Sequence, residues 1–197
     1  VGGYAEWRRK PIGVIPDYAD VKPEIARGIC RTALSARGGG WLSVDETRRL
    51  LTAYGLPLPP GGVAHTPIEA AEIARGIGFP VAVKLASHTL VHKTELGGVH
   101  LNLPDADAVR RAFCDIRDSL ERDGKLAEME GVLVQPMLKG GVEVMVGVTE
   151  DPLFGPLLAF GLGGVYVEIL RDVCFRVTPL TDLDTAEMVK SIRGYKL

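Results

Sequence analysis

The sequence predicts an α+β fold in which helices cover mostly antiparallel sheets. Helical periods begin at capping boxes, in which a Ser or Thr is followed three residues later by Glu. Runs of aliphatic residues bounded by glycine or proline are typical of strands. Two such runs, 131–137 and 142–149, are separated only by a short connection with the turn signal Lys139-Gly140-Gly141. Because so short a connection joins antiparallel neighbours, we expect hairpins rather than crossover units.

Composition narrows the class of protein without naming a function. The chain has 197 residues, 46% of them hydrophobic, which is enough for a substantial core. A formal net charge of −2 shows no excess of positive charge of the kind typical of nucleic-acid-binding proteins. The cysteines Cys30, Cys114 and Cys174 form no CxxC pair, which favours a reducing, cytoplasmic setting. No apolar run is long enough to cross a membrane, so we expect no membrane partner. Because the first residue is not Met, we expect a piece of a longer polypeptide.

Residues 1–40 differ in character from the rest and are predicted to be a linker. Arg8-Arg9-Lys10 lies among prolines and without a sustained period, which is more typical of a solvated linker than of a nucleic-acid contact. Residues 23–36 indicate a helix with Ile25, Ile29 and Leu34 as its apolar positions, and Gly38-Gly39-Gly40 ends it.

After Trp41 the elements alternate. A helix follows the capping box of Ser43 and Glu46 and ends at Gly55. A second helix follows Thr66, Pro67 and Glu69 and ends at Gly78. A third begins at Asp105, with an apolar face of Val109, Ala112, Phe113, Ile116 and Leu120, and a last helix begins at Thr181 and runs through Ile192. The expected strands are 80–86, 97–103, 131–137, 142–149, 156–161, 165–170 and 172–178.

The most informative residue is Lys84. Val81, Ala82 and Val83 suit a strand buried on both faces, so a charged side chain at its end is unfavourable unless an anion lies nearby. The alternative is a lysine whose ammonium reaches solvent past apolar neighbours.

The loop that follows Lys84 carries a second charge and two glycines. His92 and Lys93 are followed by Gly97 and Gly98, whose backbone N–H groups can approach a ligand without a Cβ in the way. Together with Lys84, this strand–loop–strand unit indicates a hairpin that closes over phosphates. His88 and His92 are each also compatible with an ordinary surface loop.

Two later positions suit a flat heterocycle and a sugar. Pro136 has no N–H and is expected to end the strand ladder, leaving the Gln135 carbonyl and the Met137 amide free to read a base edge. Met137 is equally compatible with core packing. Glu143, an acid among aliphatic residues, either faces solvent or has a polar partner. Gly161–Gly164 is a weak phosphate-binding signal, and Arg176 is compatible with either a phosphate or Glu168.

These motifs resemble one family. PVAVKLASHTLVHKTELGGVHLNL is similar to the phosphate-binding hairpin of the ATP-grasp domain in NDP-forming acyl-CoA synthetases, relatives of succinyl-CoA synthetase. LLTAYGLPLPP upstream and the stretch from Gly131 to Leu180 downstream are similar to the same family. The resemblance implies an ATP-grasp domain over 41–197 with a truncated second lobe, preceded by a linker, residues 1–40, from a CoA-ligase part.

The resemblance also implies roles for the candidate residues. Phosphate would be exchanged between ATP or ADP and a phosphohistidine during interconversion of an acid and its acyl-CoA, with His92 as a relay, and we favour His92 over His88. Nucleotide-binding residues would be Lys84, Lys93, Gly97, Gly98, Gln135, Met137 and, at the ribose, Glu143. In the family Mg²⁺ is held by an acid and an Asn-Pro segment expected outside this chain, so no metal ligand is assigned here and the chain alone is expected to lack full activity.

Two functions follow from this resemblance. The first is the nucleotide-binding part of an ADP-forming acyl-CoA synthetase, an acid–thiol ligase whose partner is a CoA-ligase domain in the same polypeptide or in another subunit. The second is a regulatory ligand-binding module of a multidomain lysine acetyltransferase. Homo-oligomerisation stays open, and the acyl substrate is not encoded in these residues.

Overall fold

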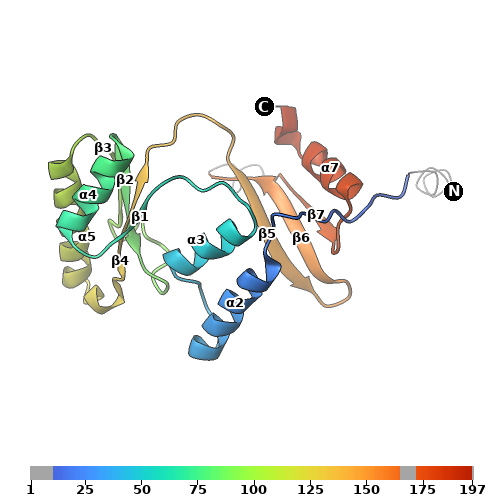
Figure 1. Cartoon of the computed structure of the whole chain (residues 1–197), viewed down its shortest axis with the longest axis horizontal. Coiled ribbons are helices and arrows are strands. Elements are labelled where there is room, and N and C mark those ends of the chain that lie inside the picture. The colour runs from blue at the N-terminus through green and yellow to red at the C-terminus, as the bar shows by residue number, and fades with distance from the viewer. Residues whose placement is uncertain (1–10, 165–171, 197) are drawn as a thin grey trace. The chain divides into compact units, whose positions relative to one another are not determined.

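A computed structural model describes residues 11–164 and 172–196. The chain divides into two compact units, residues 19–139 and residues 140–197 together with 1–18. Each unit carries one antiparallel sheet, so the prediction of an α+β fold with antiparallel sheets is confirmed (Figure 1).

The first unit is built on a four-stranded sheet in the order β1-β4-β2-β3. Its strands are β1 (Gly62–Ala64), β2 (Val81–Ala86), β3 (Val99–Leu103) and β4 (Gly131–Pro136). Strand β2 lies between β4 and β3, so its backbone is paired on both sides. Strand β1 was not predicted, because three residues beginning with glycine show no alternation and their strand geometry depends on pairing with β4.

One face of this sheet is covered by α4 (Pro67–Ile77) and α5 (Ala106–Arg122), which lie side by side in Figure 1. Thr66 and Glu69 form the predicted capping box of α4, and Asp105 caps α5. The predicted apolar face of α5 is buried at every position. The core of the unit joins these helices to the sheet and includes Val81, Val83, Leu85, Val109, Phe113, Ile116, Leu120, Val132 and Val134.

The same unit contains α2 (Pro23–Arg37) and α3 (Val44–Ala53), which pack on each other. Helix α2 is the predicted helix 23–36, and of its three expected apolar positions only Ile29 is buried. Ser43 and Glu46 form the predicted capping box of α3. The boundary proposed at residue 40 stays a prediction.

The second unit is a three-stranded sheet, β5-β6-β7, in which each neighbouring pair is antiparallel. Its strands are β5 (Val144–Asp151), β6 (Gly155–Leu162) and β7 (Val173–Val177). Helix α7 (Asp182–Ser191) begins at the predicted cap Thr181, whose hydroxyl and Asp184 form a capping box. The expected strand 165–170 lies outside the described residues.

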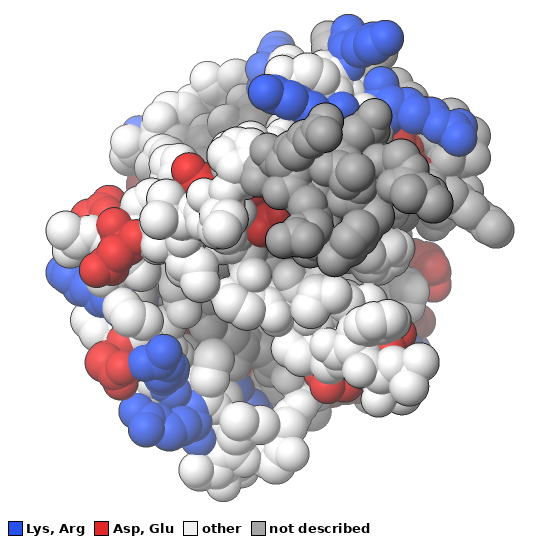
Figure 2. All heavy atoms as spheres, turned by 90° about the vertical axis from the view of Figure 1, so that its right-hand side faces the viewer, with Lys and Arg blue, Asp and Glu red and all other residues white. Residues whose placement is uncertain are grey.

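On the face drawn in Figure 2, lysine and arginine side chains form separate groups, with uncharged and acidic residues between them. Two short 3-10 helices, η1 (Leu126–Glu128) and η2 (Arg193–Lys196), are the remaining elements of residues 11–164 and 172–196. Among the described residues, no helix combines the length and apolar character needed to cross a membrane.

Candidate functional site

Lys84 lies on the central strand β2, paired with Leu133 of β4 and Val99 of β3. Its neighbours Val83 and Leu85 are fully buried in the core beneath α4 and α5. Because side chains alternate along a strand, Lys84 is directed to the opposite face of the sheet. Lys84 is half-buried there and lies inside β2, followed by the buried Leu85 and Ala86, so the expected position at the end of the strand is wrong.

That face carries a cavity of about 480 Å³ lined by Lys84, His92 and Lys93 together with Val91, Thr94, Glu95 and Val99. Three predicted site residues therefore meet around one space. The His92 side chain is 80% exposed, and its Nδ1 lies 3.6 Å from a carboxylate oxygen of Glu95. The imidazole of His92 therefore lies on the wall of the cavity and is accessible to solvent.

Lys93 is partly buried, and the pKa of its ammonium lies below its usual value. Burial lowers the pKa of its ammonium, the charge of Glu130 raises it, and the nearby Lys84 lowers it again. Two ammonium groups that repel each other beside a cavity are stabilised when a polyanion enters it. This arrangement suits the phosphates of a nucleotide better than it suits a neutral ligand.

The backbone N–H groups of Gly97 and Gly98, expected to approach a ligand, form hydrogen bonds within the loop. The N–H of Gly97 donates to the carbonyl of Thr94 at 3.1 Å, and that of Gly98 donates to the carbonyl of Lys93 at 2.7 Å. Both donors are therefore committed to the turn itself rather than directed at a ligand. A Cβ on Gly98 would lie 2.8 Å from the Lys93 carbonyl oxygen, so glycine is needed there for the loop to return close to β2.

A second, apolar cavity of about 350 Å³ adjoins the first and shares Val91 and Lys93 with it. Its walls come from α3, from the segments on either side of α3, from the loop after β2 and from β4, and include Trp41, Val44, Leu51, Leu58, Leu133 and Gln135. Of these wall residues only Gln135 was a predicted ligand-binding residue. Val44 and Leu51 could not be recognised from the sequence as wall residues, because their spacing on α3 is that of any amphipathic helix.

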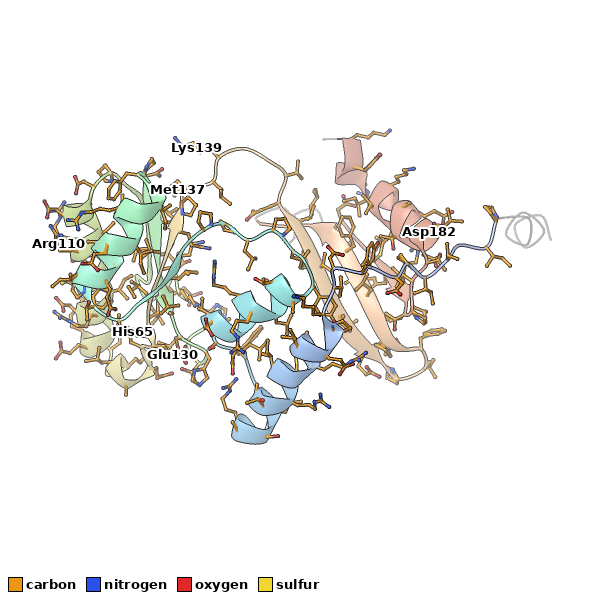
Figure 3. The ribbon with its side chains drawn as sticks, viewed as in Figure 1. His65, Arg110, Glu130, Met137, Lys139 and Asp182 are labelled. Carbon is orange, nitrogen blue, oxygen red and sulfur yellow. The ribbon has the colours of Figure 1, made fainter. Side chains whose placement is uncertain are left out.

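The backbone N–H of Met137 is not free to bind a base edge, contrary to expectation. Pro136 pairs with Val81 in the ladder, and the N–H of Met137 donates to the carbonyl of Pro80 at 3.1 Å. The ladder continues past Pro136 because the missing N–H of a proline removes one bond without ending the strand pairing. The expectation of a free Met137 N–H is therefore wrong, while Met137 itself lies at the end of β4 (Figure 3) with its side chain half-exposed.

Glu143 belongs to the second unit, directly before β5, and its side chain is exposed. Its carbonyl accepts the N–H of Gly163 at 2.7 Å, which fixes the backbone at this position. The proposed contact of Glu143 with a ribose stays a prediction.

Comparison with known proteins decides the family. A protein-family model described as "ATP-grasp domain" matches residues 33–197 of this chain. The chain belongs to the ATP-grasp family. The resemblance seen in the sequence is thereby confirmed.

Relatives of this ATP-grasp domain are ADP-forming ligases. An acetate–CoA ligase I of Archaeoglobus fulgidus is 44% identical over 81% of this chain and 23% of its own length. An acetate–CoA ligase II subunit beta of Pyrococcus furiosus is 43% identical over 77% of this chain and 64% of its own length. The chain thus spans less than two thirds of the length of these curated relatives. They give no support to the regulatory alternative.

Solved structures agree on the ATP-grasp fold. A dinucleotide-forming acetyl-coenzyme A synthetase 1 of Ca. Korarchaeum cryptofilum, in complex with coenzyme A, Ca-AMPCP and HgCl+, superposes with a TM-score of 0.79 at 40% identity, over 87% of this chain and 74% of that one. The same protein with coenzyme A and Mg-AMPPCP, its phosphohistidine segment pointing towards the nucleotide binding site, gives a TM-score of 0.70 at 37% identity over 87% and 73%.

One feature of the ATP-grasp domain that the sequence did not reveal is the anchoring of the loop after β2. Ser87 is buried, and its hydroxyl oxygen accepts the N–H groups of Thr89 and Leu90. His88, expected at a loop surface, contacts a carboxylate oxygen of Glu130 through its Nδ1. Glu130 is separated from His88 by 42 positions, so no local pattern could have indicated the pair.

Within the described part of the domain, no group of three or more His, Cys, Asp or Glu side chains has the arrangement of a metal site. Asp184 belongs to the capping box of α7, in which the N–H of Thr181 donates to its carboxylate.

Proposed function

We propose that this ATP-grasp domain is the nucleotide-binding part of an ADP-forming acyl-CoA ligase, an acid–thiol ligase that exchanges phosphate between ATP or ADP and a phosphohistidine. The observation that carries the proposal is the meeting of Lys84, Lys93 and His92 at one cavity. The names of the relatives support the reaction class.

The two adjoining cavities fit the two chemical parts of a nucleotide. The cationic cavity offers ammonium groups to the phosphates, and charge-assisted contacts of this kind are the stronger class of hydrogen bond. The apolar cavity, with Leu133 and Gln135 on its wall, offers mostly apolar surface and a few polar groups for a base. Lys93 lies on both cavities, at the place where the base-binding and phosphate-binding parts would meet.

His92 would act as the carrier. A neutral imidazole nitrogen attacks the terminal phosphorus of ATP, an N–P bond forms, the bond to the bridging oxygen breaks, and ADP leaves with the electron pair. Lys84 and Lys93 would offset the charge that develops on the oxygens. Mg²⁺, when bound, would supply further charge neutralisation at the phosphates.

The partner in this function would be a CoA-ligase domain, in the same polypeptide or in a separate subunit. One relative is itself named as a beta subunit, which supports the second arrangement. The exposed position of His92 suits a carrier that delivers phosphate to such a partner.

The first test is titration calorimetry with ADP on the wild-type chain and on Lys84→Ala. Losing one charge-assisted contact to phosphate should weaken ADP binding by about 1.5–3 kcal/mol, or roughly ten- to a hundredfold. Lys190→Ala is the matched control, because Lys190 is an exposed lysine on α7 in the other unit.

His92→Ala is the second arm of the same titration. A residue used only in phosphoryl transfer should leave ADP affinity nearly unchanged when it is removed. Equal ADP affinity for Lys84→Ala and the wild-type chain, with circular dichroism showing both folded, would rule out Lys84 as a phosphate ligand.

A further inference from the structure

The loop after β2 is held at both ends and exposed in its middle. At its start, Ser87 bonds the N–H groups of Thr89 and Leu90 at 3.2 and 3.0 Å. At its end, the hydroxyl of Ser119 on α5 donates to the carbonyl of Leu96 at 3.1 Å. Between these anchors lie the exposed His92 and the partly buried Lys93.

Two acidic side chains reach this loop from the segment that leads into β4. The Thr89 hydroxyl donates to the carboxylate of Glu128 at 2.6 Å, and His88 contacts the carboxylate of Glu130. The backbone N–H of Glu130 donates to the carbonyl of Ala86 at 2.9 Å, at the end of the β2–β4 ladder. Glu130 (Figure 3) is therefore fixed by its backbone while its carboxylate is directed at the loop.

Glu130 differs from Glu128 in also acting on Lys93. Of the charged groups around Lys93, Glu130 favours its protonated form and Lys84 opposes it. The other titratable or charged groups on the two cavities that Lys93 lines are His88, His92 and Glu95 from its own loop and Arg48 from α3. Glu130 does not line either cavity, so it is placed to act on the phosphate site through other residues.

We propose that Glu130 is a positioning residue of the nucleotide site, which holds the start of the loop that carries Lys93 through its contact with His88. The proposal rests on the function proposed above. It assigns Glu130 no contact with the nucleotide, because a carboxylate beside phosphates would repel them.

The test compares Glu130→Gln with Glu128→Gln. Each change removes one negative charge from the same acidic segment and keeps the size of the side chain, but only Glu130 acts on Lys93. ADP affinity is measured by calorimetry on the full chain from neutral to alkaline pH, with thermal unfolding as the check on folding.

Glu130→Gln should weaken ADP binding about three- to tenfold at neutral pH, the size expected when one charge-assisted contact that orders the loop is lost. Its loss of affinity with rising pH should also begin at a lower pH than in the wild-type chain, because Lys93 without Glu130 releases its proton more readily. Glu128→Gln should leave this alkaline limb unchanged. Glu130→Asp keeps the negative charge, so its ADP affinity should fall with rising pH nearly as in the wild-type chain.

Tighter ADP binding by Glu130→Gln at neutral pH would mean that repulsion of phosphate outweighs positioning, and would overturn the proposal. An unchanged alkaline limb, or the same shift in Glu128→Gln, would overturn it as well.

A separate measurement needs no nucleotide. Carbon-13 NMR of the Lys93 ε-carbon in the free chain should show a lower titration midpoint in Glu130→Gln than in the wild type. If that midpoint falls but the wild-type chain does not bind ADP, the proposed function fails while the action of Glu130 on Lys93 stands. If the midpoint does not move, the action of Glu130 fails whatever the chain binds.

Discussion

At the scale of single residues, the buried carboxylate Asp172 shows how strongly the backbone can set the charge of a side chain. Asp172 accepts the N–H groups of Arg193 and Gly194 at 2.9 and 2.8 Å. These bonds hold the pKa of Asp172 below its usual range, and they outweigh the opposite effect of burial. The carboxylate thereby ties η2 to the start of β7.

Asp172 should make the second unit sensitive to acid. Its pKa is lower in the folded chain than in the unfolded one, so its stabilising effect is complete above the unfolded value and is lost as the pH falls through the folded value. Asp172→Asn should therefore be less stable than the wild-type chain at pH ~7, and the difference should shrink below pH ~4. Urea unfolding at both pH values measures this.

The control for Asp172 is Asp115→Asn, since Asp115 is an exposed acid on α5. It should change stability little at either pH. A difference between Asp172→Asn and the wild-type chain that stays constant from neutral to acid pH would contradict the assignment.

The sequence could not have predicted this role of Asp172, whose partners lie 21 and 22 positions away. It did indicate Lys84, because a charge directly after three aliphatic strand residues is itself a local signal. The pair of His88 and Glu130 has no such local signal, because the two residues are 42 positions apart and only the sheet brings them together.

At the scale of elements, local patterns predicted the helices well. The capping boxes of α3, α4 and α7 are each formed within four consecutive residues, so a local sequence pattern is enough to predict them. Strand ends were less certain, and β2 and β3 begin one and two residues later than expected. The end of a strand depends on its partner's register, as Pro136 and Met137 show.

The return of the loop to β2 through Gly98 gives a prediction at this scale. A Cβ at Gly98 would lie 2.8 Å from the Lys93 carbonyl oxygen and 3.0 Å from the Cβ of Leu85, neither of which can swing away. Gly98→Ala should therefore destabilise the first unit by about 1–3 kcal/mol, the range of overpacking in a well-packed core. Chemical denaturation measures the change.

Gly76→Ala is the matched control. Gly76 lies in α4 with nothing within 4 Å of the added Cβ, so alanine should stabilise the helix by about 0.5–1 kcal/mol. If both alanine variants were equally stable, the close approach at Gly98 would not be a constraint in solution.

At the scale of the whole molecule, the buried apolar residues are unevenly divided. The main core lies entirely in the first unit, between Ala64 and Val134. In β5, by contrast, Val144, Val146 and Val148 are 53%, 65% and 67% exposed. Because stability follows buried apolar area, the two units should differ in resistance to local unfolding.

Hydrogen exchange measured by mass spectrometry should show this difference. Amides of β2 and β4 should exchange more slowly than those of β5, whose strand has few buried side chains. Ile116→Ala should speed exchange in the first unit selectively, since Ile116 is fully buried in its core and such truncations destabilise by about 2–5 kcal/mol. Slower exchange in β5 than in β2 would contradict this division.

The placement of the two lysines has a consequence for the order of events in time. Lys84 stands on a strand paired on both sides, so its charge is in position before any ligand arrives. Lys93 stands on the loop after β2, whose backbone bonds, such as that from the Gly98 N–H to the Lys93 carbonyl, lie within the loop and not between paired strands. In the proposed site, an arriving phosphate would meet Lys84 first, and Lys84 would govern the rate of association. Lys93 would engage afterwards, and the loop that carries it would govern how long the nucleotide stays.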